Sequence, residues 1–92
     1  MNQTSLAQQI LDEDASADEE GTWIVVYDFR DRKPCPRFWV NLRRLKELAD
    51  CRSIQYSVVV AGNRRTASAV AKLASHYGAE VAVFRGEAVA PT

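Results

Sequence analysis

The sequence has few of the residues from which metal centres and disulfide frameworks are built. Its 92 residues include one histidine and two cysteines, Cys35 and Cys51, which lack C-x-x-C spacing. A structural zinc site takes four cysteine or histidine ligands, and small secreted domains carry a larger, even set of paired cysteines. We therefore expect two reduced, partly buried thiols and neither a zinc site nor a disulfide framework.

Long apolar stretches are also missing. A membrane-spanning helix needs about 18 or more consecutive apolar residues, and the sequence contains no such run. The first residues do not combine a basic start with an apolar core, as a secretory signal does. We therefore expect a cytoplasmic protein that does not enter a membrane. The length allows one small domain with a single core, which excludes a two-domain enzyme with a closing lid.

Basic residues are absent from the first part of the chain. All twelve lysines and arginines lie at or after Arg30, whereas six of the twelve acidic residues lie in residues 1–20. Residues 1–20 thus carry a charge of −6, and residues 21–92 carry +6 from twelve basic and six acidic side chains. A basic body is typical of proteins that bind phosphate groups. We predict that residues 1–21 form an acidic, disordered extension, in which residues 5–11 have the spacing for about two turns of helix with Leu6, Ile10 and Leu11 on one side. This extension either keeps the chain soluble or competes for the basic surface of residues 22–92.

The remaining residues alternate between strand and helix patterns. Apolar residues recur at strand or helix spacing in five segments: a strand over 22–29, a helix over 36–50, an extended stretch over 53–61, a helix over 67–77 and a strand over 80–85. Pro36 suits the first position of one helix, and Thr66 suits the N-cap of the other. The alternation changes within 53–61, which indicates a bend, a bulge or two short strands. Residues 88–90 leave room for one more edge strand.

This order of elements predicts an α+β fold of the ferredoxin-like (βαββαβ) type. In such a sandwich, two helices cover one face of a small, mainly antiparallel sheet. The alternative is a fragment of a doubly wound α/β fold, with a parallel β-α-β unit over residues 58–84. We favour the sandwich, because a three-stranded parallel sheet of this size would leave one face bare.

Asp28 ends the first strand, directly after Tyr27, and is the strongest candidate for catalysis. Carboxylates at strand ends are common ligands of divalent cations. Because Mg²⁺ usually takes one or two carboxylates together with water and phosphate, a two-fold dimer could supply a second Asp28 to a shared Mg²⁺ ion. The alternative is that Asp28 caps its loop or pairs with one of Arg30, Arg32 or Lys33.

Arginine makes up most of the basic residues, which favours bidentate contacts to phosphate over single point charges. The predicted nucleic-acid contacts are Tyr27, Arg30, Arg32 and Arg37 near the end of the first strand, and Arg64 and Arg65 before the second helix. The turn over 62–66 also suggests a unit that binds phosphate through backbone N–H groups, although it matches neither G-x-G-x-x-G nor the Walker pattern. The alternative is a set of ordinary surface arginines and an ordinary turn.

With these residues in view, residues 22–85 resemble the small CRISPR-associated protein two family. The resemblance lies in the strand Ile24–Phe29 (IVVYDF), in the arginine-rich loop and helix that follow it, and in the stretch Ile54–Val58 (IQYSV). The chain departs from the family at Val59, where phenylalanine is usual, and in its acidic extension.

The resemblance implies a ferredoxin-like homodimer that acts beside an integrase subunit in spacer acquisition. It implies that Asp28 meets its symmetry mate across the dimer and holds a divalent metal, either in a metal-dependent endonuclease or in a scaffold for DNA. The predicted function is therefore binding of DNA or RNA, with Mg²⁺-dependent cleavage at Asp28 left open. The alternative is a non-enzymatic, ferredoxin-like dimeric module that binds or regulates a partner protein.

Overall fold

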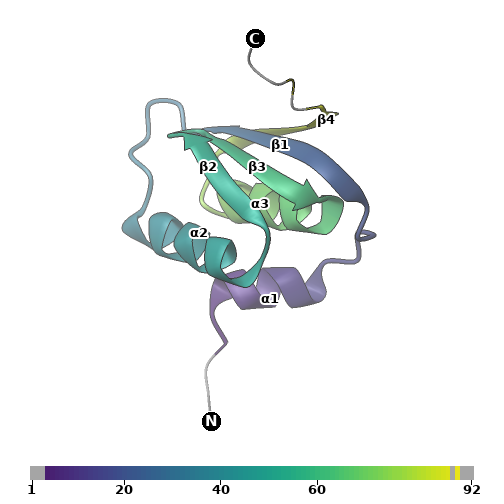
Figure 1. Ribbon diagram of the computed structural model, residues 1–92. Coiled ribbons are helices and arrows are strands. Elements are labelled where there is room, and N and C mark those ends of the chain that lie inside the picture. Colours follow the sequence, from purple (N-terminus) through teal and green to yellow (C-terminus); the bar gives the residue numbers. More distant parts are fainter. Residues whose placement is uncertain (1–3, 88, 90–92) are drawn as a thin grey trace.

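The computed structural model describes residues 4–87 and 89, which form an antiparallel sheet of four strands together with three helices (Figure 1). The elements are α1 (Leu6–Glu13), β1 (Glu20–Asp28), α2 (Pro36–Leu48), β2 (Cys51–Gln55), β3 (Val58–Asn63), α3 (Arg64–His76) and β4 (Glu80–Gly86). The strands lie in the order β2-β3-β1-β4, and each neighbouring pair is antiparallel. The predicted α+β class with an antiparallel sheet is confirmed.

The extended stretch predicted over 53–61 is a hairpin of two short strands. β2 and β3 are joined by a turn at Tyr56 and Ser57, and their register shifts between Ser53 and Gln55. The point within residues 53–61 where apolar and polar residues stop alternating corresponds to this turn. The edge strand considered over 88–90 lies outside the described residues, apart from Val89.

The third helix begins earlier than predicted, because Asn63 and not Thr66 is its N-cap. The Asn63 side-chain oxygen accepts a hydrogen bond from the Thr66 backbone N–H at 2.8 Å. Asparagine is at least as good a cap as threonine, and the arginines between them are good helix formers. Thr66 is instead buried against the sheet side of the helix.

The core lies between the sheet and the helices α2 and α3. Its largest fully buried side chains are Tyr27, Phe38, Leu42, Leu45, Leu73, Val25, Val59 and Val70. Phe38 is its aromatic centre, since the rings of Tyr27, Phe29, Trp39 and Tyr77 all lie within 4.8–6.1 Å of its ring centroid. Burying each large apolar side chain of this kind contributes roughly 1.5–3 kcal/mol.

The two turns of helix predicted over residues 5–11 of the acidic extension are present as α1, and this part of the extension contacts the body of the protein. α1 packs against α2 and α3, and its Ala7 and Leu11 are buried in the core (Figure 1). The Ser5 hydroxyl caps this helix by accepting from the Gln8 backbone N–H, and the Ala7 N–H donates to the Asn41 side chain. The acidic composition of this segment suggested disorder, because composition does not show which basic residues contact these acids in the folded chain.

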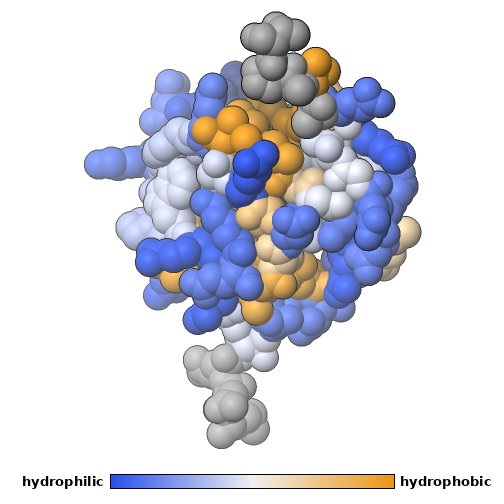
Figure 2. Space-filling view, viewed as in Figure 1, coloured by the Kyte–Doolittle hydropathy of each residue, from blue (hydrophilic) through white to orange (hydrophobic). Residues whose placement is uncertain are grey.

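The other face of the sheet is not covered by any helix among the described residues. Val25 and Tyr27 of β1 point toward the helices, so alternation places their neighbours on the opposite side. The residues that register places together on this apolar sheet face are Ile24, Val26, Val58, Val60 and Phe84. Figure 2 shows apolar surface across the middle of the molecule, with hydrophilic residues on either side. Phe84 is 56% exposed, so this face is open to a partner.

Candidate nucleic-acid interface

The structure separates the predicted site residues into two groups. Asp28 pairs with Glu80 at one end of β1, and Glu20 pairs with Asn63 at the other end. A nine-residue strand separates the two ends by about 27 Å. Tyr27, Asp28, Arg30, Arg32 and Arg37 therefore lie at or just beyond one end of the sheet, while Arg64 and Arg65 lie near the other.

Asp28 caps its own loop, which was the alternative to a metal site. Its Oδ1 accepts from the Arg30 backbone N–H at 2.7 Å, and Arg30 adopts a φ of 60° there. The Arg30 guanidinium pairs with Glu80, which is the β4 partner of Asp28. Over the part of the chain that the structure describes, no three Cys, His, Asp or Glu side chains are placed to hold a metal ion. A Mg²⁺ ion shared between two copies of Asp28 stays a prediction.

Tyr27 is a core residue and not a surface contact. Its side chain is 1% exposed, and its hydroxyl donates a hydrogen bond of 2.7 Å to the Tyr56 carbonyl oxygen. Burial, with a smaller contribution from Tyr56, raises the pKa of Tyr27 to about 12. The prediction that Tyr27 contacts nucleic acid is corrected, because the ring fills the space between β1 and α2.

The segment that follows β1 and continues through α2 to the start of β2 is strongly basic, and its last basic residue, Arg52, pairs with Val60 on the open face of the sheet. Its eight basic residues are all exposed: Arg30, Arg32, Lys33, Arg37, Arg43, Arg44, Lys46 and Arg52. The same segment holds only three acidic residues, so the Arg30–Arg52 surface has a net charge of +5. Arg30 pairs with Glu80 and Arg44 with Glu47, and the described residues provide no ion pair for the other six. α2 directs its apolar residues to the core, and this leaves its arginines facing solvent.

The other four basic residues are held by the N-terminal segment. The contacts are Lys72 with the Asp14 carboxylate at 3.0 Å, Arg65 with the Leu11 carbonyl at 2.5 Å, and Arg64 and Arg85 with the Glu19 carboxylate. Residues 11–19 thus bind the basic side chains of α3 and β4 and leave the Arg30–Arg52 surface free. The charge asymmetry suggested that the acidic extension competes for the basic surface. The contacts found here involve Arg64 and Arg65 and not the loop after Asp28.

The turn over 62–66 uses its backbone donors within the chain. The Gly62 N–H donates to the Asp50 carbonyl, the Arg64 N–H to the Glu19 carbonyl, and the Thr66 N–H to the Asn63 side chain. A Cβ at Gly62 would lie 2.0 Å from an Asp50 carboxylate oxygen, so any larger residue here would displace the Asp50 side chain. The turn therefore lacks these donors for a phosphate, which removes the basis of the predicted phosphate-binding unit.

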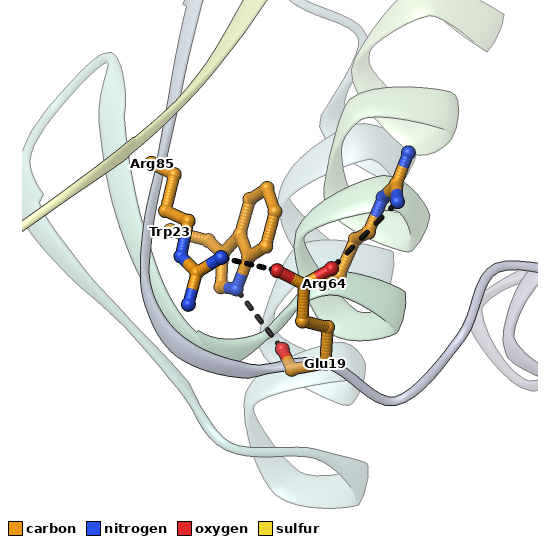
Figure 3. A network of polar contacts seen from close by, with 4 residues as sticks. All are labelled: Glu19, Trp23, Arg64 and Arg85. Atoms are coloured by element: carbon orange, nitrogen blue, oxygen red, sulfur yellow. Dashed lines mark hydrogen bonds and ion pairs between the residues drawn. The ribbon is translucent and has the colours of Figure 1, made fainter.

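The residues that sequence reasoning missed are Glu19, Trp23 and Arg85, which form one network with Arg64 (Figure 3). Glu19 was predicted only as part of the acidic extension, and no function was predicted for Trp23 or Arg85. The positions of the charged residues in the sequence give no signal for this network, because Glu19 and Arg85 are 66 positions apart.

Comparison of the chain with protein-family models, curated proteins and solved structures finds no match. The resemblance to the CRISPR-associated protein two family stays a prediction. Among the residues that the structure describes, no helix is long and apolar enough to cross a membrane. Function therefore has to follow from the surface chemistry of the chain itself.

Proposed function

We propose that the protein binds nucleic acid through the Arg30–Arg52 surface. The observation that carries this proposal is the run of eight exposed basic residues, six of which have no ion pair among the described residues. Free guanidinium groups bind phosphate oxygens in a bidentate manner. The exposed side of α2 carries a basic row of Arg37 and Arg44, which lie about two turns and 10 Å apart, with Arg43 beside it. A duplex presents a backbone charge about every 1.7 Å along its axis, so several phosphates face such a row.

We infer that the fold is ferredoxin-like, with α1 as an additional helix. The order βαββαβ from β1 to β4 and the strand order β2-β3-β1-β4 support this inference. The fold places α2 and the loop before it at the surface while β1 remains in the centre of the sheet. This arrangement suits a scaffold that holds nucleic acid along a helix, which agrees with the scaffold function implied by the family resemblance.

Salt-dependent binding tests the proposal directly. Duplex DNA and duplex RNA are titrated with the full chain at 50 and 200 mM salt, using fluorescence anisotropy. Each phosphate contact adds about 0.9 to the slope of log affinity against log salt, so Arg37→Gln with Arg43→Gln should lower that slope by about 2. The matched control is Arg65→Gln with Lys72→Gln, which removes the same charge from two basic residues that Leu11 and Asp14 occupy, and it should change the slope little.

Two results would contradict the proposal: no salt-dependent binding by the natural chain, or equal losses for the two double variants. Asp28→Asn should leave binding intact, because Asp28 caps its own loop and is not part of the basic row. Cleavage that requires Mg²⁺ and disappears in Asp28→Asn would add endonuclease activity to the binding function.

The apolar sheet face favours a second candidate function, which is association with another copy of the chain. Four strands spaced about 4.8 Å apart along a nine-residue β1 give the whole sheet face an upper limit of roughly 500–600 Å² per copy. Two copies would bury at most roughly 1,000–1,200 Å², which is at the lower limit of a stable interface. Stacked sheets pair identical apolar faces around a two-fold axis, so the face fits a homodimer.

Sedimentation of the full chain at micromolar concentration tests this association. Phe84→Lys should give a monomer, because it places a charge on the buried face at its most exposed apolar residue. Val40→Lys is the matched control, since Val40 is a similarly exposed apolar residue that lies on α2. A natural chain that sediments as a monomer, or a dimer that Phe84→Lys leaves intact, would exclude this function.

A further inference from the structure

Two arginines far apart in the sequence converge on one carboxylate beside Trp23 (Figure 3). Arg85 donates to Oε2 of Glu19, and Nη1 of Arg64 lies 3.8 Å from Oε1 of the same carboxylate. The guanidinium carbons of Arg64 and Arg85 lie 5.9 and 5.5 Å from the centre of the Trp23 ring. Cation–π attraction to the indole holds both guanidinium groups near the carboxylate.

The backbone of Glu19 is fixed independently of its side chain. Its carbonyl oxygen accepts from the Trp23 indole N–H at 3.0 Å and from the Arg64 backbone N–H at 2.8 Å. Gly21, with a φ of 151°, lets the chain pass under the Arg85 guanidinium. The Glu19 carboxylate is 38% exposed and makes only ion pairs that face solvent. It can therefore swing away from the arginines while the segment stays in place.

The charge balance around the Glu19 carboxylate favours an anion that carries more negative charge than a carboxylate. Two guanidinium groups face a single negative charge, and both arginine side chains are more than half exposed. Phosphate offers more acceptor oxygens and matches the planar donor pair of each guanidinium. A hollow of about 500 Å³ adjoins the site between α3 and β4, and its lining includes Trp23, Ser75 and Val83. This hollow has room for the group that carries the phosphate.

We propose that Arg64, Trp23 and Arg85 form a phosphate site, which the Glu19 carboxylate occupies as an internal ligand and vacates when a phosphate group arrives. The phosphate belongs either to a nucleic-acid backbone or to a free polyphosphate. The site goes beyond the proposed function, because it lies at the opposite end of β1 from the loop that begins the Arg30–Arg52 surface. An attached carboxylate competes at millimolar effective concentration, so its removal should strengthen phosphate binding markedly.

Trp23 provides a local reporter of this site. The chain has two tryptophans, so Trp39→Phe leaves Trp23 as the only indole. In this background, Glu19→Gln is compared with Glu20→Gln, which removes the same charge from the next residue, an exposed one outside the network. Both proteins are titrated with sodium tripolyphosphate and, separately, with a single-stranded oligonucleotide. Circular dichroism verifies that each variant is folded.

Tripolyphosphate should change the Trp23 emission and saturate, with an affinity about tenfold higher in Glu19→Gln than in Glu20→Gln, because two exposed ion pairs hold the carboxylate only weakly. Adding Arg85→Gln should remove this gain. Equal affinities in the two glutamate variants, or a gain that survives Arg85→Gln, would overturn the inference.

The two proposals fail in different ways. If oligonucleotide binding depends on Arg37 and Arg43 but Glu19→Gln gains nothing with tripolyphosphate, the phosphate site is wrong and the proposed function stands. If tripolyphosphate binds at Trp23 while the oligonucleotide binds to neither variant, the phosphate site stands and its ligand is a free polyphosphate. Gains of similar size with both probes would identify the nucleic-acid backbone as a ligand.

Discussion

Asp14→Asn tests whether the N-terminal segment is locked to the body of the protein. The Asp14 side chain has no exposed surface, its Oδ1 accepts from the Ser16 N–H at 2.7 Å, and Lys72 Nζ lies 3.0 Å from its Oδ2. Burial alone would raise the pKa of Asp14. Hydrogen bonds from Ser68 and Ser16, together with the Lys72 ammonium, outweigh burial and hold the pKa well below its ordinary value. The ionised carboxylate is therefore the form that the fold stabilises.

The size of the effect follows from these contacts. Removing one partner of a buried ion pair costs about 3–5 kcal/mol, and a hydrogen bond to a charged group contributes about 1.5–3 kcal/mol. Lys72 is about half exposed, so its ammonium can turn to water after the substitution. Asparagine also keeps one acceptor oxygen. We therefore expect a loss of about 2–3 kcal/mol, which lowers the urea midpoint of a chain of this size by about 2 M.

The pH dependence has a defined sign. Because the folded-state pKa of Asp14 lies below its unfolded value of about 3.9, its contribution is fully present above that value and disappears as the pH falls through the folded-state pKa. The difference in the free energy of unfolding between the natural chain and Asp14→Asn should be largest at pH 7 and should become smaller below about pH 4. Asp12→Asn, at an exposed position of α1, is the control and should cost less than about 0.5 kcal/mol. Equal midpoints for both variants, or a gap that stays constant to pH 3, would refute the reasoning.

Three further predictions concern the core. Phe38→Ala should lower the free energy of unfolding by about 3–5 kcal/mol in a urea titration, because the ring is fully buried among other aromatic rings. Burial raises the pKa of Tyr27 to about 12, so Tyr27 should ionise near pH 12 in an alkaline absorbance titration. This ionisation step should vanish in Tyr27→Phe. The stability that Tyr27 contributes is present below about pH 10 and is lost as the pH rises toward 12. Burial also raises the pKa of the Cys51 thiol to about 11, so a thiol reagent at pH 8 should label the exposed Cys35 rapidly and Cys51 only after unfolding.

The strands and helices from β1 to β4 were predictable because their signals are local. The apolar residues of α2 recur at helical spacing, and three of them on one face, Phe38, Leu42 and Leu45, are buried. The boundary of α3 was missed because Asn63 and Thr66 are both good caps, and a local pattern does not decide between them. Tyr27 was misplaced for a different reason, since its position before Asp28 does not reveal which face of β1 it occupies.

The N-terminal segment was unpredictable from composition, because its acidic residues are paired over long sequence separations. Asp14 meets Lys72, and Glu19 meets Arg64 and Arg85. A single sequence contains no pattern that marks such pairs. For the same reason Arg64 and Arg65 were predicted to contact nucleic acid, although in the folded chain Arg64 contacts Glu19 and Arg65 contacts Leu11.

The zero net charge of the chain conceals two surfaces that act independently. The acids of residues 14–19 lie beside α3 and β4, whereas Arg30–Arg37 lies beyond the far end of β1, about 27 Å away by strand length. The Debye length at physiological ionic strength is about 8 Å, so Glu19 cannot screen this loop. Substitutions at separated sites without shared contacts have additive free energies. The binding changes caused by Glu19→Gln and by Arg37→Gln should therefore add in the double variant, and a marked departure from additivity would show that one nucleic acid spans both surfaces.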